Sequence, residues 1–350
     1  ITVSNSSEAR TLTAEGTYTV VLTTKDYAQN TATRTYTIKL RFPHVGDYVD
    51  YRPDIPSSGY NLNSDKSGWD TNQIIGINDD PTEWRIMEID ENRKITKLLG
   101  IGAKDVYLYG SKGYNNGVYL LNDICKSRYG NSSLGATARS LNIDDIEEKM
   151  NNVGIQARNS YKCGNVQYGT TKKYIGNYTK YPYIYSYEKY SGTGVSDISD
   201  GTQVITGNVD KNAQGKMNPN GKQFSDSVYS SSTSLTVGST ATSLTCVQTF
   251  YGVTQSNSYY DNTEFYNLIF ETNTYFWLAS RYTICYTDGY GASFGIRGVT
   301  NSNTSGCDLF YSAGLDRLDY RHIAAVVFLN CDIQPNTGYG TKENPYILTK

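Results

Sequence analysis

The residue types that most often carry out catalysis are scarce in this chain. It has two histidines, His44 and His322, and neither has a Ser or Cys partner in a nucleophile motif. The acid pair Asp144 and Asp145 stands at the start of a predicted helix, where capping accounts for it. The six cysteines show no CxxC spacing and no neighbouring histidine, which argues against zinc. We therefore expect no catalytic residue, no metal and no cofactor, and mostly free or incidental thiols.

One stretch has oxygen-bearing side chains at alternate positions. Asp210, Asn212 and Gln214 resemble the opening of a calcium loop. The twelfth position of that loop is Gly221 instead of the bidentate Glu, and no second helix is predicted after it. A polar turn is the better interpretation.

The composition favours binding over catalysis. Tyr occurs 33 times, against 9 Phe and 3 Trp, and it accompanies many Ser, Thr, Asn and Gly residues. Tyr offers contact area at low entropic cost while its hydroxyl stays hydrated, and Tyr and Arg are frequent anchors of binding surfaces. The residues expected to contact a ligand are Tyr282, Tyr286, Asp288, Tyr290, Asn301, Asn303, Asp308, Tyr311, Asp316, Arg317, Asp319, Tyr320, Arg321 and His322. The alternative is a solvated loop surface with no dedicated ligand.

Two apolar runs bound these residues and are predicted to hold them. Residues 275–281, which include Trp277, and residues 323–329 are short apolar runs typical of buried strands. Between them, alternation over 292–297 predicts a strand with Ala292, Phe294 and Ile296 on one face and Ser293, Gly295 and Arg297 on the other. Loops at 282–290, 300–305 and 308–322 are expected to gather at one end, with side chains that mostly face solvent.

The rest of the chain predicts an α+β domain over 44–350. A strand is expected at 45–51, others at 83–89, 95–101 and 244–251, and a closing edge strand at 342–348. Apolar spacing predicts a helix over 118–126, and a second helix over 143–150 capped by Asn142 or Ser140. Residues 264–270 fit a short helix or a strand. Residues 161–232 have no stable periodicity and are interpreted as a loop-rich insertion, with a possible hairpin near 180–190.

The first 41 residues form a separate small β-unit in this interpretation. Residues 16–22 and 33–40 alternate with period two, and the turn between them carries Asp26, Ala28 and Asn30. This unit resembles the last hairpin of a bacterial immunoglobulin-like domain, truncated, and such modules usually act as spacers. Residues 41–44 are the expected boundary.

The C-terminal motifs resemble a C-type-lectin-like domain. They are Tyr275-Phe-Trp-Leu-Ala-Ser-Arg281, Ala292-Ser-Phe-Gly-Ile-Arg297 and the closing apolar strand, with Leu141–Glu147 and Leu244–Tyr251 as further signatures. That domain occurs in surface proteins of Gram-positive gut bacteria and their prophages, and is related in fold to sulfatase-modifying-factor domains. One departure is the pair Ala324-Ala325, where relatives usually carry Arg-Pro before the last strand.

A compositional gap links the same segment to diversification. Residues 278–333 contain no Lys, Glu, Gln, Met or Trp, the five amino acids whose codons must end in A or G. Mutagenesis of adenines in Asn-type codons would leave this pattern. The resemblance implies a relation to target proteins of diversity-generating retroelements, in which a reverse transcriptase randomises adenines in one C-terminal segment.

Composition also bounds the location and the partners. A net charge of −2 gives no electrostatic case for nucleic acid or an anionic membrane, and no apolar run is long enough for a transmembrane helix. No signal peptide is visible, so we interpret the chain as a segment of a longer exported protein. The expectation is an extracellular binder on a cell or phage virion, with a protein or glycan partner. Two alternatives stay open, namely an invariant carbohydrate-binding adhesin and an enzyme of the sulfatase-modifying type.

Overall fold

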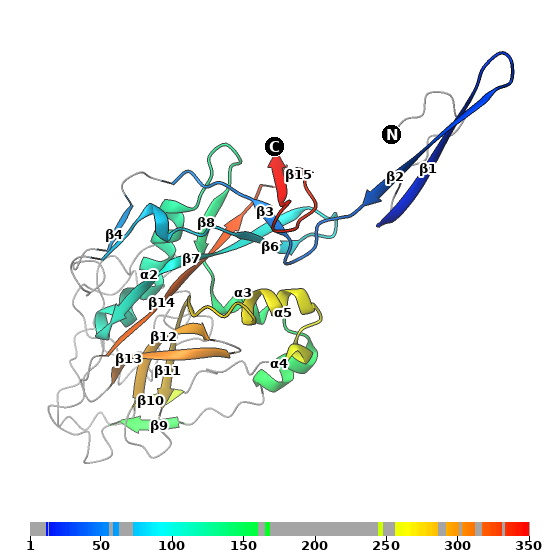
Figure 1. Cartoon of the computed structure of the whole chain (residues 1–350). Coiled ribbons are helices and arrows are strands. Elements are labelled where there is room, and N and C mark those ends of the chain that lie inside the picture. Colours follow the sequence, from blue (N-terminus) through cyan, green and yellow to red (C-terminus); the bar gives the residue numbers. More distant parts are fainter. Residues whose placement is uncertain are drawn as a thin grey trace.

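The structure is a computed structural model that describes residues 12, 14–55, 59–62, 73–159, 165–168, 244–247, 256–285, 292–300, 303–311, 317–330 and 333–349. It has an α+β architecture in which one large sheet dominates and a two-stranded hairpin projects away from it (Figure 1). No helix in these ranges is both long and apolar enough to cross a membrane.

The N-terminal hairpin forms as the sequence predicts. Strands β1 (Gly16–Lys25) and β2 (Thr31–Leu40) pair antiparallel over their full length. The carboxylate of Asp26 accepts hydrogen bonds from the backbone N–H and the side-chain amide of Asn30, each at 2.8 Å, and these bonds lower the pKa of Asp26. Side chains on both faces are exposed or half-buried, so the hairpin encloses no core of its own.

The large sheet has ten strands, and the strand near the C-terminal end of the chain lies in its middle. Along the sheet the strands are β13 (Asn303–Tyr311), β12 (Ala292–Thr300), β11 (Phe276–Cys285), β14 (Leu318–Phe328), β7 (Ile95–Tyr109), β6 (Trp84–Ile89), β3 (Tyr48–Asp50), β16 (Tyr346–Thr349) and β15 (Gln334–Thr337), with β8 (Thr137–Ser140) paired to β14. β14 runs antiparallel to β7 and parallel to β11. Two short pairs lie outside this sheet: β4 (Tyr60–Leu62) with β5 (Gln73–Ile75), and β9 (Asn165–Tyr168) with β10 (Leu244–Val247).

Helices cover both faces of this sheet. They are α2 (Gly110–Arg128), α3 (Ile143–Glu147), α4 (Asn152–Asn159) and α5 (Thr263–Phe270), with short 3₁₀ turns η1 (Ile77–Asp79) and η3 (Asn257–Tyr259). The first core lies between the sheet and α2, and the second lies between the opposite face and α3 and α5. The predicted packing of two helices on the sheet is therefore confirmed.

Alternation along β14 explains its continuous apolar run. Ile323, Ala325 and Val327 belong to the first core. Ala324 and Val326 belong to the second core, because successive side chains of a strand point to opposite faces. Trp277 is fully buried in the first core, as predicted, and its indole Nε1 donates to the backbone oxygen of Val106 at 2.6 Å.

The second helix begins at a side-chain cap. The Asn142 side-chain oxygen accepts from the backbone N–H of Asp145 at 3.0 Å, and the Asp145 carboxylate accepts from the backbone N–H of Asn142 at 3.0 Å. Asn142 is thus the cap, whereas the other candidate, Ser140, ends β8. Asp145 also forms a two-point ion pair with Arg139, so capping and pairing together explain this acid.

Several predicted element boundaries were wrong. The strand expected at 45–51 is only β3, because residues 45 and 46 form a turn in which Gly46 has a φ of 88°. The third strand and the first helix are longer than predicted, as β7 and α2 show, and the segment 264–270 is helical. The predicted edge strand at 342–348 appears as β16, which lies between β3 and β15, so the edge is β15.

Some elements were not predicted, and some predictions cannot be compared. β8 and α4 were missed, and β9 lies within the 161–232 segment interpreted as loops. Of the predicted strand at 244–251, residues 244–247 form β10. The possible hairpin at 180–190 and the calcium-like turn at 210–221 lie outside the described residues.

Candidate binding surface

The predicted binding segment is largely built into the sheet. Residues 276–285, 292–300, 303–311 and 318–328 are strands, so loops cannot span 282–290, 300–305 and 308–322 as expected. β12 and β13 form a tight hairpin in which Thr300 pairs with Asn303. The expectation that side chains over 282–322 mostly face solvent is also wrong for the described residues, because Ile296, Val299 and Leu309 are buried in the two cores.

Arg297 shows that alternation predicts the face of a side chain but not its exposure. Ile296 faces the first core, as the pattern requires, but Arg297 on the other face is 1% exposed. Both sides of β12 are covered here, because α2 packs on one face and α5 contacts the strand from the other. Arg297 is therefore an interior residue and not part of a solvent-facing surface.

An exposed apolar surface lies where β7 ends and β14 begins. In the antiparallel register Leu318 lies opposite Tyr109 and Tyr320 lies opposite Tyr107. The side chains of Tyr107, Tyr109, Leu318 and Tyr320 are 36%, 44%, 55% and 54% exposed, and we call these four residues the tyrosine patch. The Tyr107 and Tyr320 rings are in contact, with centroids 5.2 Å apart and planes tilted by 36°.

Alternation places the tyrosine patch on one face of the sheet. Val106 and Leu108, the intervening residues of β7, are fully buried in the first core. The opposite face of β14 carries Val326 and Ala324 in the second core, followed by His322, Tyr320 and Leu318. The tyrosine patch therefore continues the face that α3 and α5 cover farther along the strand.

His322 is fixed at the border of this patch. Its Nδ1 lies 2.7 Å from the backbone oxygen of Gly102, which accepts a hydrogen bond when Nδ1 carries the proton. Its Nε2 lies 3.7 Å from the Asp105 carboxylate, the cross-strand partner of His322. These contacts orient the ring, and they involve no hydroxyl or thiol nucleophile among the interactions described for it.

Arg321 points to the other side of the sheet and serves as an internal anchor. Its Nε donates to Cys307 Sγ at 2.7 Å, and its guanidinium lies over the rings of Trp277 and Tyr275 at 5.7 and 5.8 Å. Gly298 leaves the space that this side chain occupies, since an added Cβ would lie 2.7 Å from Arg321 Cδ. The expectation that Arg321 is a displayed contact residue is therefore wrong.

Cys307 is a packed residue of the first core. Burial, the largest cause, raises the pKa of its thiol well above the usual range, against the opposite effect of Arg321. Cys125 is also buried, and both thiols are free, as expected for these two.

The other predicted contact residues fall into three groups. Arg317 is exposed, whereas Asp308 and Asp319 are half-buried, and Asp319 accepts from the backbone N–H of Tyr320 at 2.7 Å. Three residues have only their backbone described, in β11 and β13; they are Tyr282, Asn303 and Tyr311. Five lie outside the described residues; they are Tyr286, Asp288, Tyr290, Asn301 and Asp316.

Of the four residues of the tyrosine patch, sequence analysis included only Tyr320 among the expected contact residues. Tyr107 and Tyr109 lie in a run, Asp105-Val-Tyr-Leu-Tyr109, with a clear period of two. That pattern was a usable signal for a half-buried strand with an aromatic outer face. The predicted strand ended at residue 101, so the run was not connected to the C-terminal segment.

Other candidate chemistry finds little support in the structure. His44 Nε2 pairs with Glu15 at 2.8 Å and belongs to the boundary between the hairpin and the body. Over the part of the chain that the structure describes, no three His, Cys, Asp or Glu side chains are placed to hold a metal ion. Comparison of the chain with models of protein families, with curated proteins and with solved structures finds no significant match.

Proposed function

We propose that this protein is a non-enzymatic, extracellular ligand-binding protein whose residues 44–350 form a C-type-lectin-like display domain. Residues 1–41 serve as a spacer with an immunoglobulin-like hairpin. The partner is a protein or glycan on another surface, and the display domain belongs to a cell-surface or phage protein.

The observation that carries this proposal is the tyrosine patch. Four large side chains from two neighbouring strands stand exposed on one continuous face, while Leu108 between the two tyrosines of β7 is buried and Asp319 between Leu318 and Tyr320 is half-buried. Contiguous exposed apolar surface rimmed by polar groups is a mark of an interaction site. Tyr rings held in a sheet need little ordering on binding, which favours affinity.

The codon-limited segment supports the same location. Leu318 and Tyr320 lie within residues 278–333, and so does the exposed residue Arg317. Arg317 directly precedes β14 and the other two lie in its first three residues, whereas residues 323–327 of the strand are buried. In a diversified protein, variation at these three positions changes the surface without disturbing the packed half of the strand.

A matched pair of variants tests the proposal. Tyr320 and Tyr339 are equally exposed, at 54% and 53%, but Tyr339 lies in the loop beside the hairpin. The chain and its Tyr320→Ala and Tyr339→Ala variants are applied to an oligosaccharide array and to an array of purified bacterial surface proteins. We expect specific signals that Tyr320→Ala abolishes or redirects and Tyr339→Ala leaves unchanged.

The alternatives give different outcomes. If ligand binding is unchanged in both variants, or is reduced equally in both, the tyrosine patch is not the binding site. A carbohydrate ligand, together with flanking DNA that lacks a template repeat and a reverse-transcriptase gene, supports the invariant adhesin. An enzyme of the sulfatase-modifying type requires an apposed pair of reactive cysteines, which mass spectrometry after thiol alkylation of the folded protein detects.

A further inference from the structure

The four residues that join the hairpin to the body, 41–44, are held by specific contacts. Arg41, the first of them, forms a two-point ion pair with Asp47, with Nη1–Oδ2 at 2.8 Å and Nη2–Oδ1 at 2.6 Å. Its Nη1 also donates to the backbone oxygen of Tyr339 and to the hydroxyl of Tyr346 at 3.2 Å. The guanidinium thus ties the end of β2 to three segments of the body at once. Ion-pair and hydrogen-bonding contacts with Asp47 raise the pKa of Arg41, which keeps it charged.

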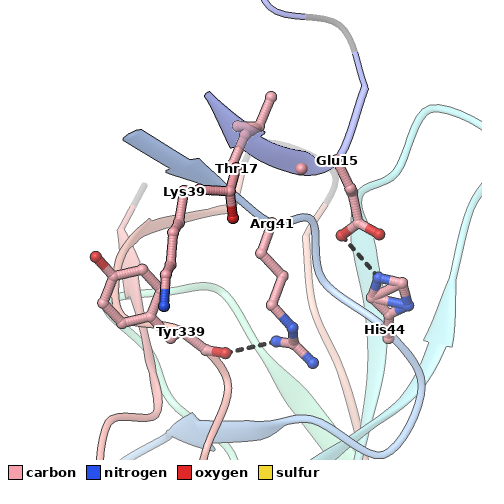
Figure 2. Close-up of a pocket in the computed structure, with 8 residues that line it drawn as sticks. Glu15, Thr17, Lys39, Arg41, His44 and Tyr339 are labelled. Carbon is pink, nitrogen blue, oxygen red and sulfur yellow. Dashed lines mark hydrogen bonds and ion pairs between the residues drawn. The ribbon is translucent and has the colours of Figure 1, made fainter. Parts of the chain in front are cut away.

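The next residues are held from both sides. The ring of Phe42 lies under the guanidinium of Arg93, 4.0 Å from the ring centroid, in the turn between β6 and β7. The Glu15 carboxylate, just before β1, accepts from the backbone N–H of Phe42 and lies 2.8 Å from His44 Nε2. Figure 2 shows Glu15 and His44 facing each other on one side of Arg41. Pro43, between Phe42 and His44 in the sequence, has its φ angle fixed by its ring.

The body is shaped to receive Arg41. Asp47 is mostly buried, and its Oδ2 accepts from the backbone N–H of His44 at 2.8 Å besides pairing with Arg41. Gly340 has a φ of 69°, and a Cβ there would lie 2.6 Å from the Tyr346 ring, 2.7 Å from Arg41 Nη1 and 2.8 Å from Asp47 Cγ. Only glycine fits between these groups.

We propose that residues 41–44 form a rigid elbow, which holds the hairpin at one fixed angle to the body. Arg41 anchors the linker to the body, and Glu15 anchors the base of the hairpin to the linker. A flexible tether needs freely rotating residues, but each of these four is restrained by a side-chain contact, a backbone hydrogen bond or a ring. A pocket of about 400 Å³ remains at the elbow, and its lining includes Glu15, Lys39 and Tyr339 (Figure 2).

A fixed angle has a directional consequence. The hairpin leaves the body on one side, while β11, β12 and β13 lie on the opposite side (Figure 1). A rigid elbow therefore presets the direction in which the body faces relative to whatever the hairpin is attached to. This inference concerns the joint alone, and it stands whether or not the tyrosine patch binds a ligand.

Distance measurements between two spin labels test the elbow. Labels are attached through a keto-bearing amino acid, which leaves the cysteines unmodified, at the exposed positions Tyr27 in the hairpin turn and Val153 on α4. We expect one narrow distance in the otherwise unchanged chain, and loss of that single distance in the double variant Glu15→Ala/Arg41→Ala. The measurement is repeated with the hairpin label moved from Tyr27 to Thr37, an exposed residue near the hairpin base, and the second label kept at Val153. Comparison of the two distances separates movement at the elbow from bending of the hairpin.

Two further variants make the result decisive. Arg52→Ala removes an exposed Arg–Asp pair of similar geometry that lies outside the elbow, and it should keep the narrow distance. Gly340→Ala displaces Arg41 without removing a charge, and it should broaden the distribution while near-UV circular dichroism shows an intact body. A broad distribution in the unchanged chain, or a narrow one in both Glu15→Ala/Arg41→Ala and Gly340→Ala, overturns the proposal.

Discussion

The two halves of β14 belong to one strand that pairs with β7, with a register shift between His322 and Ala324, but their environments are opposite. From Ile323 to Val327 the strand is buried on both faces, with one face against each core. From Leu318 to His322 one face carries the exposed members of the tyrosine patch, and the other is occupied by Arg321 and Asp319. The difference teaches that a displayed surface can begin within a strand, without a loop, at the point where the covering helices stop.

The largest effect is expected at the buried half. Trp277→Ala removes a fully buried ring and its hydrogen bond to Val106, so we expect a loss of about 3–5 kcal/mol in the free energy of unfolding. Urea denaturation followed by circular dichroism measures this value. Tyr320→Ala is the control, and equal losses in the two variants would erase the distinction between the halves.

The next effect concerns the interior beneath the exposed half. Burial raises the pKa of the Cys307 thiol in the folded protein above its value in the unfolded chain. The resulting contribution to stability is fully present at pH values below the unfolded-state pKa, and it is lost as the pH rises from there toward the folded-state pKa. Above pH ~8.5 the wild-type chain should lose about 1.4 kcal/mol per pH unit relative to Cys307→Ala. Unfolding curves between pH 7 and 10 measure the difference. Parallel curves for the two proteins would mean that solvent reaches the thiol.

A smaller loss is expected for Arg321→Ala. This side chain packs against Trp277 and donates to Cys307, so its removal should cost about 1–2 kcal/mol, more than an ordinary surface substitution. Thermal and urea unfolding of the variant provide the measurement, with the exposed Arg317→Ala as control. If the free energy of unfolding falls by less than about 0.5 kcal/mol, Arg321 behaves as an ordinary surface residue and again becomes a candidate ligand contact.

The smallest effect is expected within the tyrosine patch itself. Tyr107→Ala and Tyr320→Ala should each change stability by about 0.5 kcal/mol or less, because both rings remain substantially exposed. Their ring contact should give a coupling energy of roughly 0.2–0.5 kcal/mol in a double-mutant cycle, within the loss expected for each single variant. A cycle with no coupling would indicate that the two tyrosines do not act as one surface.

The sequence predicted the buried strands better than the surface. The apolar run ending at Leu329 and the motif around Trp277 were recognised because continuous burial leaves a continuous apolar signature. The sequence offered two candidates for the N-cap of α3, Asn142 and Ser140. Only the structure distinguishes them, because it shows that Ser140 is the last residue of β8. Local patterns thus located the core, and tertiary pairing set the boundaries.

The candidate site was only partly predictable, for a physical reason. Tyr320 was identified from its residue type, but its neighbour Tyr107 comes from a strand far earlier in the chain, and only the β7–β14 register brings them together. Arg321 was misassigned because polar composition suggests exposure, whereas its side chain packs over Trp277 and donates to Cys307. Residue type therefore showed what could bind, and the sheet determined which residues are accessible.

The central position of β14 governs the order in which this molecule can assemble. β14 lies between β7 and β11, so β7 lacks one of its two neighbours until residues 318–328, more than 200 positions farther along the chain, have been synthesised. When such distant segments pair, the intervening chain loses conformational entropy before the contacts between the strands stabilise the pairing, and this slows folding. Until then the edge of β7 is open to other chains during synthesis. Truncation within β14 should therefore yield aggregation-prone protein, and not a smaller folded domain.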